Sequence, residues 1–308
     1  MRLVTYSFRG TTRLGAMRAD NEVIDLARAS ALNGEAVPHD MMALLALGDA
    51  GLDAARRALA AGDQHARGNR ASAIAHGIVF QTNEPGFRLE APVMKPGKVL
   101  AIGLNYRDHA EEAGMKIPER PVVFTKVPSC ITGPGMPIHR PRVSSSVDWE
   151  AELCAIIGTR ARHVKAAEAL RYVAGLACGN DVSVRDWQFH SGTWMMGKGF
   201  DTHGPLGPWL VTLDEVGDPA NLDIRTLVNG VEKQHSNTRH LIFNIGQIIE
   251  YLTAAFTLEP GDVIFTGTPA GVGASRKPQE WLKAGDTVRV EISKLGALEN
   301  PVIEEPES

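Results

Sequence analysis

From about residue 98 onward, short apolar runs alternate with turn-forming residues. Apolar runs of roughly four to eight residues that are bounded by glycine, proline or aspartate are typical of β-strands. The runs are VLAIGL, PVVFTK, AELCAIIG, GPWLVTL, DVIFTG and TVRVEIS. This part of the chain is therefore predicted to be mainly β.

Three stretches have a helical pattern instead. In HLIFNIGQIIEYLTAAF the apolar residues repeat at intervals of three and four, and VKAAEALRYVAG also has a helical pattern. Nearer the N-terminus, MMALLALGDAGLDAARRALAAG is rich in alanine and leucine and carries charges on one side. Each of these stretches predicts a helix.

The first residues predict a small unit of their own. LVTYSF and LGAMRADNEVIDLA are typical of short strands, and Ala19-Asp20-Asn21-Glu22 has the polar residues of a hairpin turn. The polar stretch DQHARGNRAS then marks the end of this unit. We expect a small N-terminal α+β domain at residues 1–75 and a larger domain at residues 76–308, with the tail NPVIEEPES frayed. The fold class is thus α+β, mainly β with α.

Composition and charge favour a small-molecule partner. The chain has 308 residues, 44% of them hydrophobic, and a formal net charge of −4. It can bury a large core, but it has no electrostatic attraction for nucleic acid or anionic membranes. Three separated cysteines without a CxxC pair fit a reducing, cytoplasmic setting. MRLVTYSFRG lacks the apolar core of an export signal and polar residues interrupt LIFNIGQIIEYLTAAF, so we expect neither export nor membrane insertion.

Three acidic residues predict a cation site. Glu150 and Glu152 lie two apart at the start of a predicted strand, and the period of two sends both side chains to one face. Such carboxylates repel each other unless a cation or protons intervene. Asp181 follows the apolar stretch YVAGLAC, which could carry it into the same interior. Oxygen ligands without a nearby His or Cys pair favour Mg²⁺ or Mn²⁺ over zinc.

A plainer interpretation of these residues is structural. Glu150 and Glu152 could line a solvated strand face, and Asp181 and Asp186 could cap the next element. For an isolated ExE pair this interpretation is favoured, because most carboxylates are exposed. The surrounding sequence instead favours a metal site.

Five segments occur in the order that fumarylacetoacetate hydrolase family proteins have. They are KPGKVLAIGLNYRDHAEEAG, VDWEAELCAIIG, GNDVSVRDWQ, GKGFDTHGPLGPWLV and LEPGDVIFTGTPAGVG. From about Lys95 to Pro301 the chain therefore resembles this family. The resemblance implies a catalytic domain with a twisted, mixed β-roll fold and usually a homodimer. It also implies that Glu150, Glu152 and Asp181 are the metal ligands.

His109 and Glu112 form a candidate acid-base pair. They lie three apart in NYRDHAEEAG, so on a helix they would be neighbours, and the carboxylate could orient the imidazole. A solvated helix with ordinary surface residues is the alternative that composition favours. The resemblance implies instead that His109 and Glu112 activate the attacking water from a lid that closes over substrate.

Further pocket residues are implied by the resemblance. Lys198, between glycines in MMGKGFD, would stabilise negative charge on a substrate oxygen, although such a lysine could also be a flexible surface charge. Arg185, Gln188 and Thr268 match substrate-contacting positions, although Arg185 could instead pair with Asp181 or Asp186. In SNTRHLIF the chain departs from many relatives, and the resulting Arg239 could hold a distal carboxylate or simply face solvent.

These residues together predict hydrolytic cleavage of a C–C bond in an acylpyruvate-like β-diketo acid, through an enolate that the metal and Lys198 stabilise. Alternatives with the same enolate are decarboxylation of oxaloacetate and isomerase, hydratase or lyase chemistry on a 2-oxo acid. A non-catalytic, metal-dependent binder of 2-oxo acids is an alternative of a different class. TGTPAGVG lacks the ending of a phosphate loop, and no GxSxG elbow is present, so nucleotide binding and a nucleophilic triad are not supported.

Overall fold

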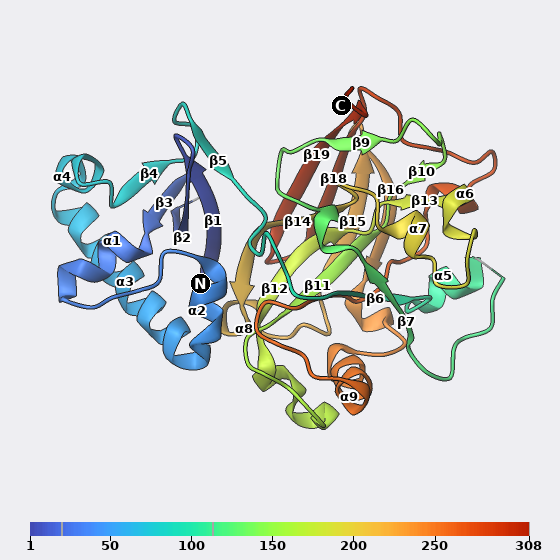
Figure 1. Ribbon diagram of the computed structural model, residues 1–308, viewed down its shortest axis with the longest axis horizontal. Coiled ribbons are helices and arrows are strands. Elements are labelled where there is room, and N and C mark those ends of the chain that lie inside the picture. The colour runs from blue at the N-terminus through green and yellow to red at the C-terminus, as the bar shows by residue number, and fades with distance from the viewer. Residues whose placement is uncertain (20, 113, 308) are drawn as a thin grey trace.

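A mixed twelve-stranded sheet runs through the molecule (Figure 1), and the fold is α+β, as predicted. The computed structural model describes residues 1–19, 21–112 and 114–307. The strands of this sheet are β1 (Arg2–Phe8), β2 (Thr11–Ala19), β3 (Glu22–Asp25), β4 (Val79–Gln81), β5 (Phe87–Leu89), β6 (Val99–Gly103), β7 (Val122–Lys126), β8 (Ile131–Thr132), β11 (Ala151–Ile157), β12 (Val173–Asn180), β14 (Gly204–Thr212) and β17 (Val263–Phe265). Their order is β4-β3-β2-β1-β14-β12-β11-β17-β6-β7, while β5 pairs with β1 and β8 with β14.

A five-stranded sheet packs against strands β11 and β12 of the large sheet (Figure 1), and it is ordered β16-β15-β18-β19-β9. Its strands, with the separate pair β10 and β13, are β9 (Ile138–Arg140), β10 (Val147–Asp148), β13 (Ser183–Val184), β15 (Asp223–Val228), β16 (Val231–Asn237), β18 (Thr287–Ile292) and β19 (Gly296–Glu304). The helices and 3-10 turns are α1 (Leu26–Ser30), η1 (Ala31–Asn33), α2 (Met41–Ala46), α3 (Gly48–Gly68), α4 (Arg70–Ala75), α5 (Arg107–Glu112), η2 (Pro128–Cys130), η3 (Ala166–Tyr172), α6 (Arg185–Gln188), α7 (Met195–Lys198), α8 (Leu213–Val216), η4 (Thr238–His240), α9 (Ile245–Ala255) and η5 (Gly273–Ser275).

The central strands β11 and β12 are buried along their whole length because both sheet faces are covered. On one face, Cys154 and Ile156 belong to a core that continues into the N-terminal unit. On the other face, Leu153 and Ala155 pack with α9 and the second sheet. Strands that are buried on both faces have continuous apolar sequences, as AELCAII shows.

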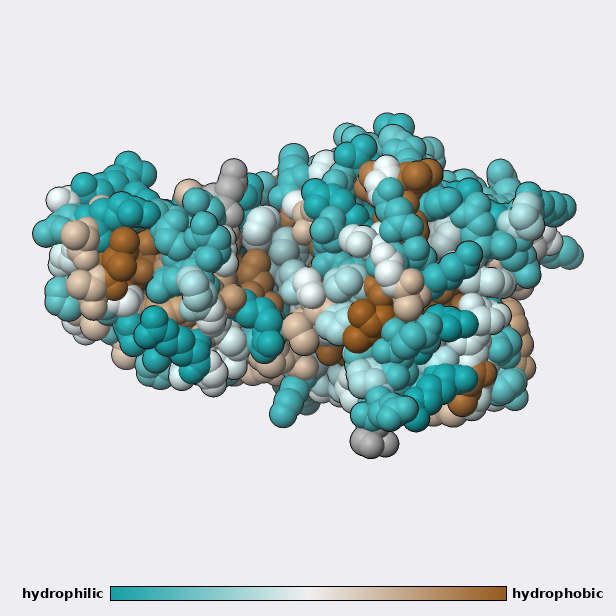
Figure 2. Space-filling model, turned by 90° about the horizontal axis from the view of Figure 1, so that it is seen from above, coloured by the Kyte–Doolittle hydropathy of each residue, from teal (hydrophilic) through white to brown (hydrophobic). Residues whose placement is uncertain are grey.

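The N-terminal unit is joined to the rest by a shared strand pair. Its helices α1 and α3 pack against strands β2 and β3 (Figure 1). Strand β1 pairs with β14, placing Leu3 opposite Leu210. Strands β4 and β5 lie beyond residue 75 and pair with β3 and β1. The molecule is elongated, and its surface is mostly hydrophilic with separate hydrophobic patches (Figure 2).

Several elements differ from their predicted form. The alanine-rich stretch forms two helices, because Gly48 has a φ of 58° and begins a new helix after α2. In VKAAEALRYVAG the predicted helix is wrong: the chain forms the 3-10 turn η3, and strand β12 begins at Val173. The tail is not frayed throughout, because residues 300–304 belong to β19, where Val302 pairs with Ile138.

The predicted hairpin near Ala19 and the predicted helix after Asn244 agree with the structure. Ala19 and Glu22 pair across β2 and β3, although Asp20 of the predicted turn lies outside the described residues. Helix α9 begins at the predicted stretch after Asn244, whose side chain forms a capping box with Gln247. Across residues 1–19, 21–112 and 114–307, none of the helices has the length and apolar content that a membrane crossing requires.

Candidate metal and active site

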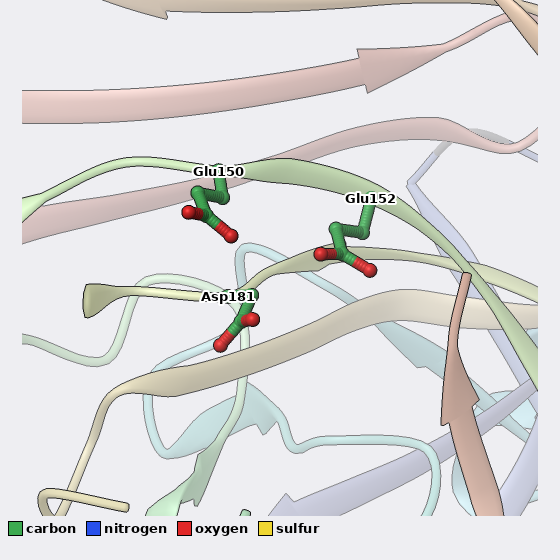
Figure 3. A group of neighbouring side chains, drawn as sticks. All are labelled: Glu150, Glu152 and Asp181. Atoms are coloured by element: carbon green, nitrogen blue, oxygen red, sulfur yellow. The ribbon is translucent and has the colours of Figure 1, made fainter. Parts of the chain in front are cut away.

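Three buried carboxylates meet where β11 and β12 lie side by side (Figure 3). Glu150 directly precedes β11, Glu152 lies within it, and Asp181 directly follows β12. The antiparallel register places Ala151 opposite Asn180, and the Asp181 backbone N–H donates to the Glu150 carbonyl at 2.9 Å. One oxygen from each carboxylate lies within 4.8 Å of the others. Glu150 and Glu152 thus lie on one side of the strand, as their spacing of two residues predicts. The three carboxylates together could bind a metal ion.

Two buried lysines accompany these carboxylates. Lys198 Nζ lies 2.8 Å from Glu150 Oε2 and 2.7 Å from Asp181 Oδ2. Burial alone would lower the pKa of Lys198, but Asp181 and Glu150 outweigh burial and raise that pKa. Lys126 Nζ donates to Asp181 Oδ1 at 2.6 Å and also to the Lys198 carbonyl. Lys198 is therefore not a flexible surface charge but a buried cation between two of the proposed ligands.

Arg185 supplies a third cation. Its guanidinium lies 2.8 Å from Asp148 Oδ2 and 2.7 Å from Glu150 Oε1, and its Nη1 donates to Gln188 Oε1 at 3.0 Å. The pairing with Asp181 or Asp186 that the sequence left open is absent from the described residues' ion pairs. Arg185 thus forms an ion pair with Oε1 of Glu150, the oxygen that does not contact Lys198.

Glu152 differs from its two neighbours in having no cation partner among the described residues. Its Oε2 accepts the Gly267 backbone N–H at 2.6 Å. Burial, Asp181 and Glu150 raise the pKa of Glu152 well above its usual value. For Glu150, burial also acts to raise the pKa, but Lys198 and Arg185 outweigh it and lower that pKa to about 2. Glu152 therefore has no cation to balance its ionised form, and its raised pKa means that this form is disfavoured unless a cation is supplied.

A cavity of about 60 Å³ opens beside the carboxylates. It brings together most of the residues that the sequence singled out. Its lining is Ile102, Gly103, Leu104, His109, Phe124, Glu150, Glu152, Arg185, Gln188, Trp194, Lys198 and Thr268.

Helix α5 closes one side of the cavity with the predicted acid-base pair. His109 Nδ1 lies 3.3 Å from Glu112 Oε2, and the Gly271 N–H donates to Glu112 Oε1 at 3.0 Å. Burial acts to raise the pKa of Glu112, but His109 and Gly271 outweigh it and lower that pKa. Ser236 of β16 also donates to Asp108 Oδ2 at 2.9 Å, so α5 is held both to the Gly271 loop and to β16.

Arg239 lies apart from this group. It belongs to η4, its side chain is exposed, and its Nε lies 3.4 Å from His240 Nε2. It is not among the residues that line the cavity. Its segment does approach α5, because Leu241 forms a β-bridge with Tyr106 just before that helix. The structure therefore does not bring Arg239 to the carboxylates.

Three residues of the site were missed by sequence reasoning. Asp148 accepts hydrogen bonds from the backbone N–H groups of Gly273 and Ala274 besides its contact with Arg185, and its signal was its place two before Glu150. Lys126 shares the buried face of β7 with Phe124, and a lysine at an apolar strand position was its signal. Gln234, which contacts Thr268, has no comparable signal in the sequence.

The α+β fold and this acid-lined cavity place the chain in the class of enzymes that act on small acids. The family model "Fumarylacetoacetate (FAA) hydrolase C-terminal" matches residues 98–303, so the chain belongs to the fumarylacetoacetate hydrolase family. It is 41% identical to a Dictyostelium discoideum fumarylacetoacetate hydrolase domain-containing protein 2 homolog, covering 98% of this chain and 97% of that one. It is also 41% identical to the mitochondrial oxaloacetate tautomerase fahd2 of Xenopus laevis, covering 98% and 90%.

Solved structures of related enzymes share the whole fold. A fumarylacetoacetate hydrolase from Exiguobacterium antarcticum matches with a TM-score of 0.80 and 31% identity, covering 99% of this chain and 100% of that one. The 2-hydroxyhepta-2,4-diene-1,7-dioate isomerase from Mycobacterium marinum matches with a TM-score of 0.72 and 31% identity, covering both chains completely. Hydrolases and isomerases of this family thus use one architecture.

Proposed function

We propose that this chain is a divalent-metal-dependent hydrolase that cleaves a C–C bond of an acylpyruvate-like β-diketo acid. The observation that carries the proposal is the meeting of an unbalanced carboxylate group with the His109–Glu112 pair at one cavity. The metal ligands are Glu150, Glu152 and Asp181 in this proposal. Relatives named as hydrolases and isomerases support chemistry on a small acid.

The donor set fits a divalent cation. Its oxygens are those that Mg²⁺ and Mn²⁺ prefer, and Glu152 lacks a positive partner among the described residues. When bound, Mg²⁺ or Mn²⁺ would supply the positive charge that polarises the 2-oxo group and stabilises negative charge on the substrate. Lys126, Lys198 and Arg185 have their ion-pair partners in Asp181, Glu150 and Asp148, so none of these cations pairs with Glu152.

The protein's own groups would carry the proton transfers. The Glu112 carboxylate orients and stabilises the His109 imidazole, which takes a proton from water as the water oxygen adds to the distant carbonyl. The C–C bond then breaks, and its electron pair forms the enolate of a pyruvate-type product while the other fragment leaves as a carboxylic acid. His109 returns its proton to the enolate carbon.

Substrate orientation falls to the remaining cavity residues. Lys198 can stabilise negative charge on a substrate oxygen, and Arg185, Gln188 and Thr268 can contact its carboxylate. The cavity volume of about 60 Å³ lies well below the roughly 300 Å³ at which typical ligand sites begin. Helix α5 therefore has to move outward before a β-diketo acid enters.

Tautomerisation of oxaloacetate is a second candidate function. It is favoured by relatives with that name, including the rat mitochondrial protein, which is 42% identical over 87% of this chain and 81% of that one. The reaction removes a proton from carbon 3 and adds one to the 2-oxo oxygen, and it passes through the enolate of oxaloacetate, which carries its negative charge on the same 2-oxo oxygen as a pyruvate-type enolate does. It needs no attacking water, so the same cation site would suffice.

Direct identification of products separates the two reactions. We expect pyruvate and the matching acid from an acylpyruvate panel with Mg²⁺ or Mn²⁺, and a loss of about 100-fold or more in His109→Ala. Enol–keto exchange of oxaloacetate without release of any acid would assign the tautomerase instead. No metal-dependent turnover of either substrate type would contradict both proposed reactions.

We further propose that the chain forms a homodimer, on the family resemblance, and that it is located in the cytoplasm, on its cysteine usage.

A further inference from the structure

The side chain of Gln234 ties together three segments around the cavity. It is 1% exposed and lies on β16. Its Oε1 accepts the Ala151 backbone N–H at 2.9 Å and the Thr226 hydroxyl at 2.7 Å. Its Nε2 donates to Thr268 Oγ1 and to the Pro269 carbonyl, both at 2.8 Å. All four hydrogen-bonding positions of the carboxamide are thereby used.

Backbone groups at both ends fix which way this amide faces. The Ala151 N–H can only donate, so it requires the amide oxygen, and the Pro269 carbonyl can only accept, so it requires the amide nitrogen. Thr268 Oγ1 must consequently accept from Gln234. Its own hydroxyl hydrogen then points elsewhere, and among the described residues no acceptor receives it.

Thr268 lines the cavity beside the carboxylates and is 4% exposed. We infer that Gln234 is a positioning residue that sets the polarity of the Thr268 hydroxyl, so that Thr268 donates a hydrogen bond to an anionic oxygen of the substrate. The inference rests on the proposed 2-oxo acid substrate, whose carboxylate would be the acceptor. Because Ala151 lies between Glu150 and Glu152, the same amide also holds the two proposed ligands against the Thr268 loop.

Oxalate is a suitable probe because it presents a carboxylate beside a second oxygen, as a 2-oxo acid does, but cannot react. We would measure its dissociation constant by calorimetry with the full chain and Mg²⁺. Gln234→Glu keeps the shape and the accepting oxygen but offers Thr268 an acceptor, so the hydroxyl hydrogen would turn away from the cavity. We expect oxalate affinity to fall roughly tenfold or more.

A double-mutant cycle distinguishes positioning from general loosening. In a Thr268→Val background, which has no hydroxyl to orient, Gln234→Glu should change oxalate affinity less than twofold further. Thr226→Val is the matched control, because it removes a hydrogen bond from the other end of the same amide. It should lower the unfolding temperature but change affinity less than twofold.

Three results would overturn the inference: unchanged affinity in Gln234→Glu, an equal loss in both backgrounds, or an equal loss in Thr226→Val. If Gln234→Glu does not fold, Thr268→Val and Thr268→Ser decide, since only the serine variant should keep oxalate affinity. Oxalate binding that responds to Gln234 without turnover of any 2-oxo acid would leave the inference standing and contradict the proposed function. Normal turnover without a response to Gln234 would do the reverse.

Discussion

Lys198 is buried between two of the three carboxylates of the site. Its ammonium bridges Glu150 and Asp181, two carboxylates that the proposal assigns to the metal. A divalent cation bound there would therefore compete with this lysine for negative charge. Lys198 and Lys126 already balance part of that charge.

Replacing Lys198 tests this competition. In Lys198→Met we expect Mn²⁺ to bind about tenfold more tightly, because the carboxylates lose their built-in cation, while turnover falls by about 100-fold through lost stabilisation of substrate charge. Calorimetry and product assays measure the two effects. Lys98→Met is the matched control, since it breaks the ion pair with Asp262 and should change neither. Weaker Mn²⁺ binding in Lys198→Met would contradict the competition.

The residues that the sequence could predict are those that local spacing brings together. Glu150 and Glu152 share a face by the strand period, and His109 and Glu112 share one by the helix period. Gln234 could not be predicted, because its role depends on a contact with Thr268, 34 positions away. The apolar strand position of Lys126 is a signal of burial, but it does not indicate the partner Asp181, 55 positions away. Arg239 lies at the expected segment, but spacing alone could not show that its side chain is exposed.

At the scale of elements, α5 is the part that we propose moves when substrate enters. Among the described residues, the contacts that hold it include those from Gly271 to Glu112 and from Ser236 to Asp108. Such a short helix with few contacts opens at low free energy.

Hydrogen exchange measures this opening directly. We expect the amides of α5 to exchange faster in Ser236→Ala than in the wild type, and to become protected when Mg²⁺ and oxalate are added. The amides of α9, which packs in the core, serve as the internal control. Equal protection of α5 with and without ligand would show that substrate does not need this helix to open.

In the N-terminal unit, Glu22 joins several elements through one carboxylate. Its oxygens accept from Arg70 at 2.6 Å and Gln81 at 2.8 Å, and Arg18 also contacts it. The contact with Arg70 is the largest cause that lowers the pKa of Glu22 to about 2. Three elements, α4, β4 and β2, are thereby attached to β3.

This carboxylate predicts a pH dependence of stability. A lowered pKa in the folded state means that the stabilisation is complete above the ordinary value near 4.5 and is lost as pH falls toward 2. Glu22→Gln should cost about 2 kcal/mol at pH 7, and its stability should then change less between pH 4.5 and 2. Urea unfolding at several pH values measures this. A constant difference between variant and wild type across that range would contradict it.

At the scale of the whole molecule, the sequence predicts the strands better than their partners. The apolar runs correctly predicted β6, β7, β11, β17 and β18, because a buried strand needs apolar residues close together in the sequence. The pairing of β1 with β14 and the extension of one sheet through both parts of the chain depend on contacts across about 200 residues. No local pattern encodes such pairing, so the order of the strands was not predicted.

The homodimer stays a prediction at this scale. Light scattering on the purified chain should give twice the mass of 33.2 kDa at micromolar concentration. Dilution into the nanomolar range provides the control for weak association. A mass of a single chain at every concentration would contradict the prediction without affecting the proposed chemistry.

The central claim is that a divalent cation binds at Glu150, Glu152 and Asp181, and a calorimetric titration of Mn²⁺ tests it most directly. Glu152→Gln is the informative variant, because it keeps the side-chain shape and leaves the Lys198 contacts in place. We predict one Mn²⁺ per chain in the wild type and an affinity at least about 100-fold lower in Glu152→Gln. Equal Mn²⁺ binding by both proteins would place the metal elsewhere and contradict the proposed site.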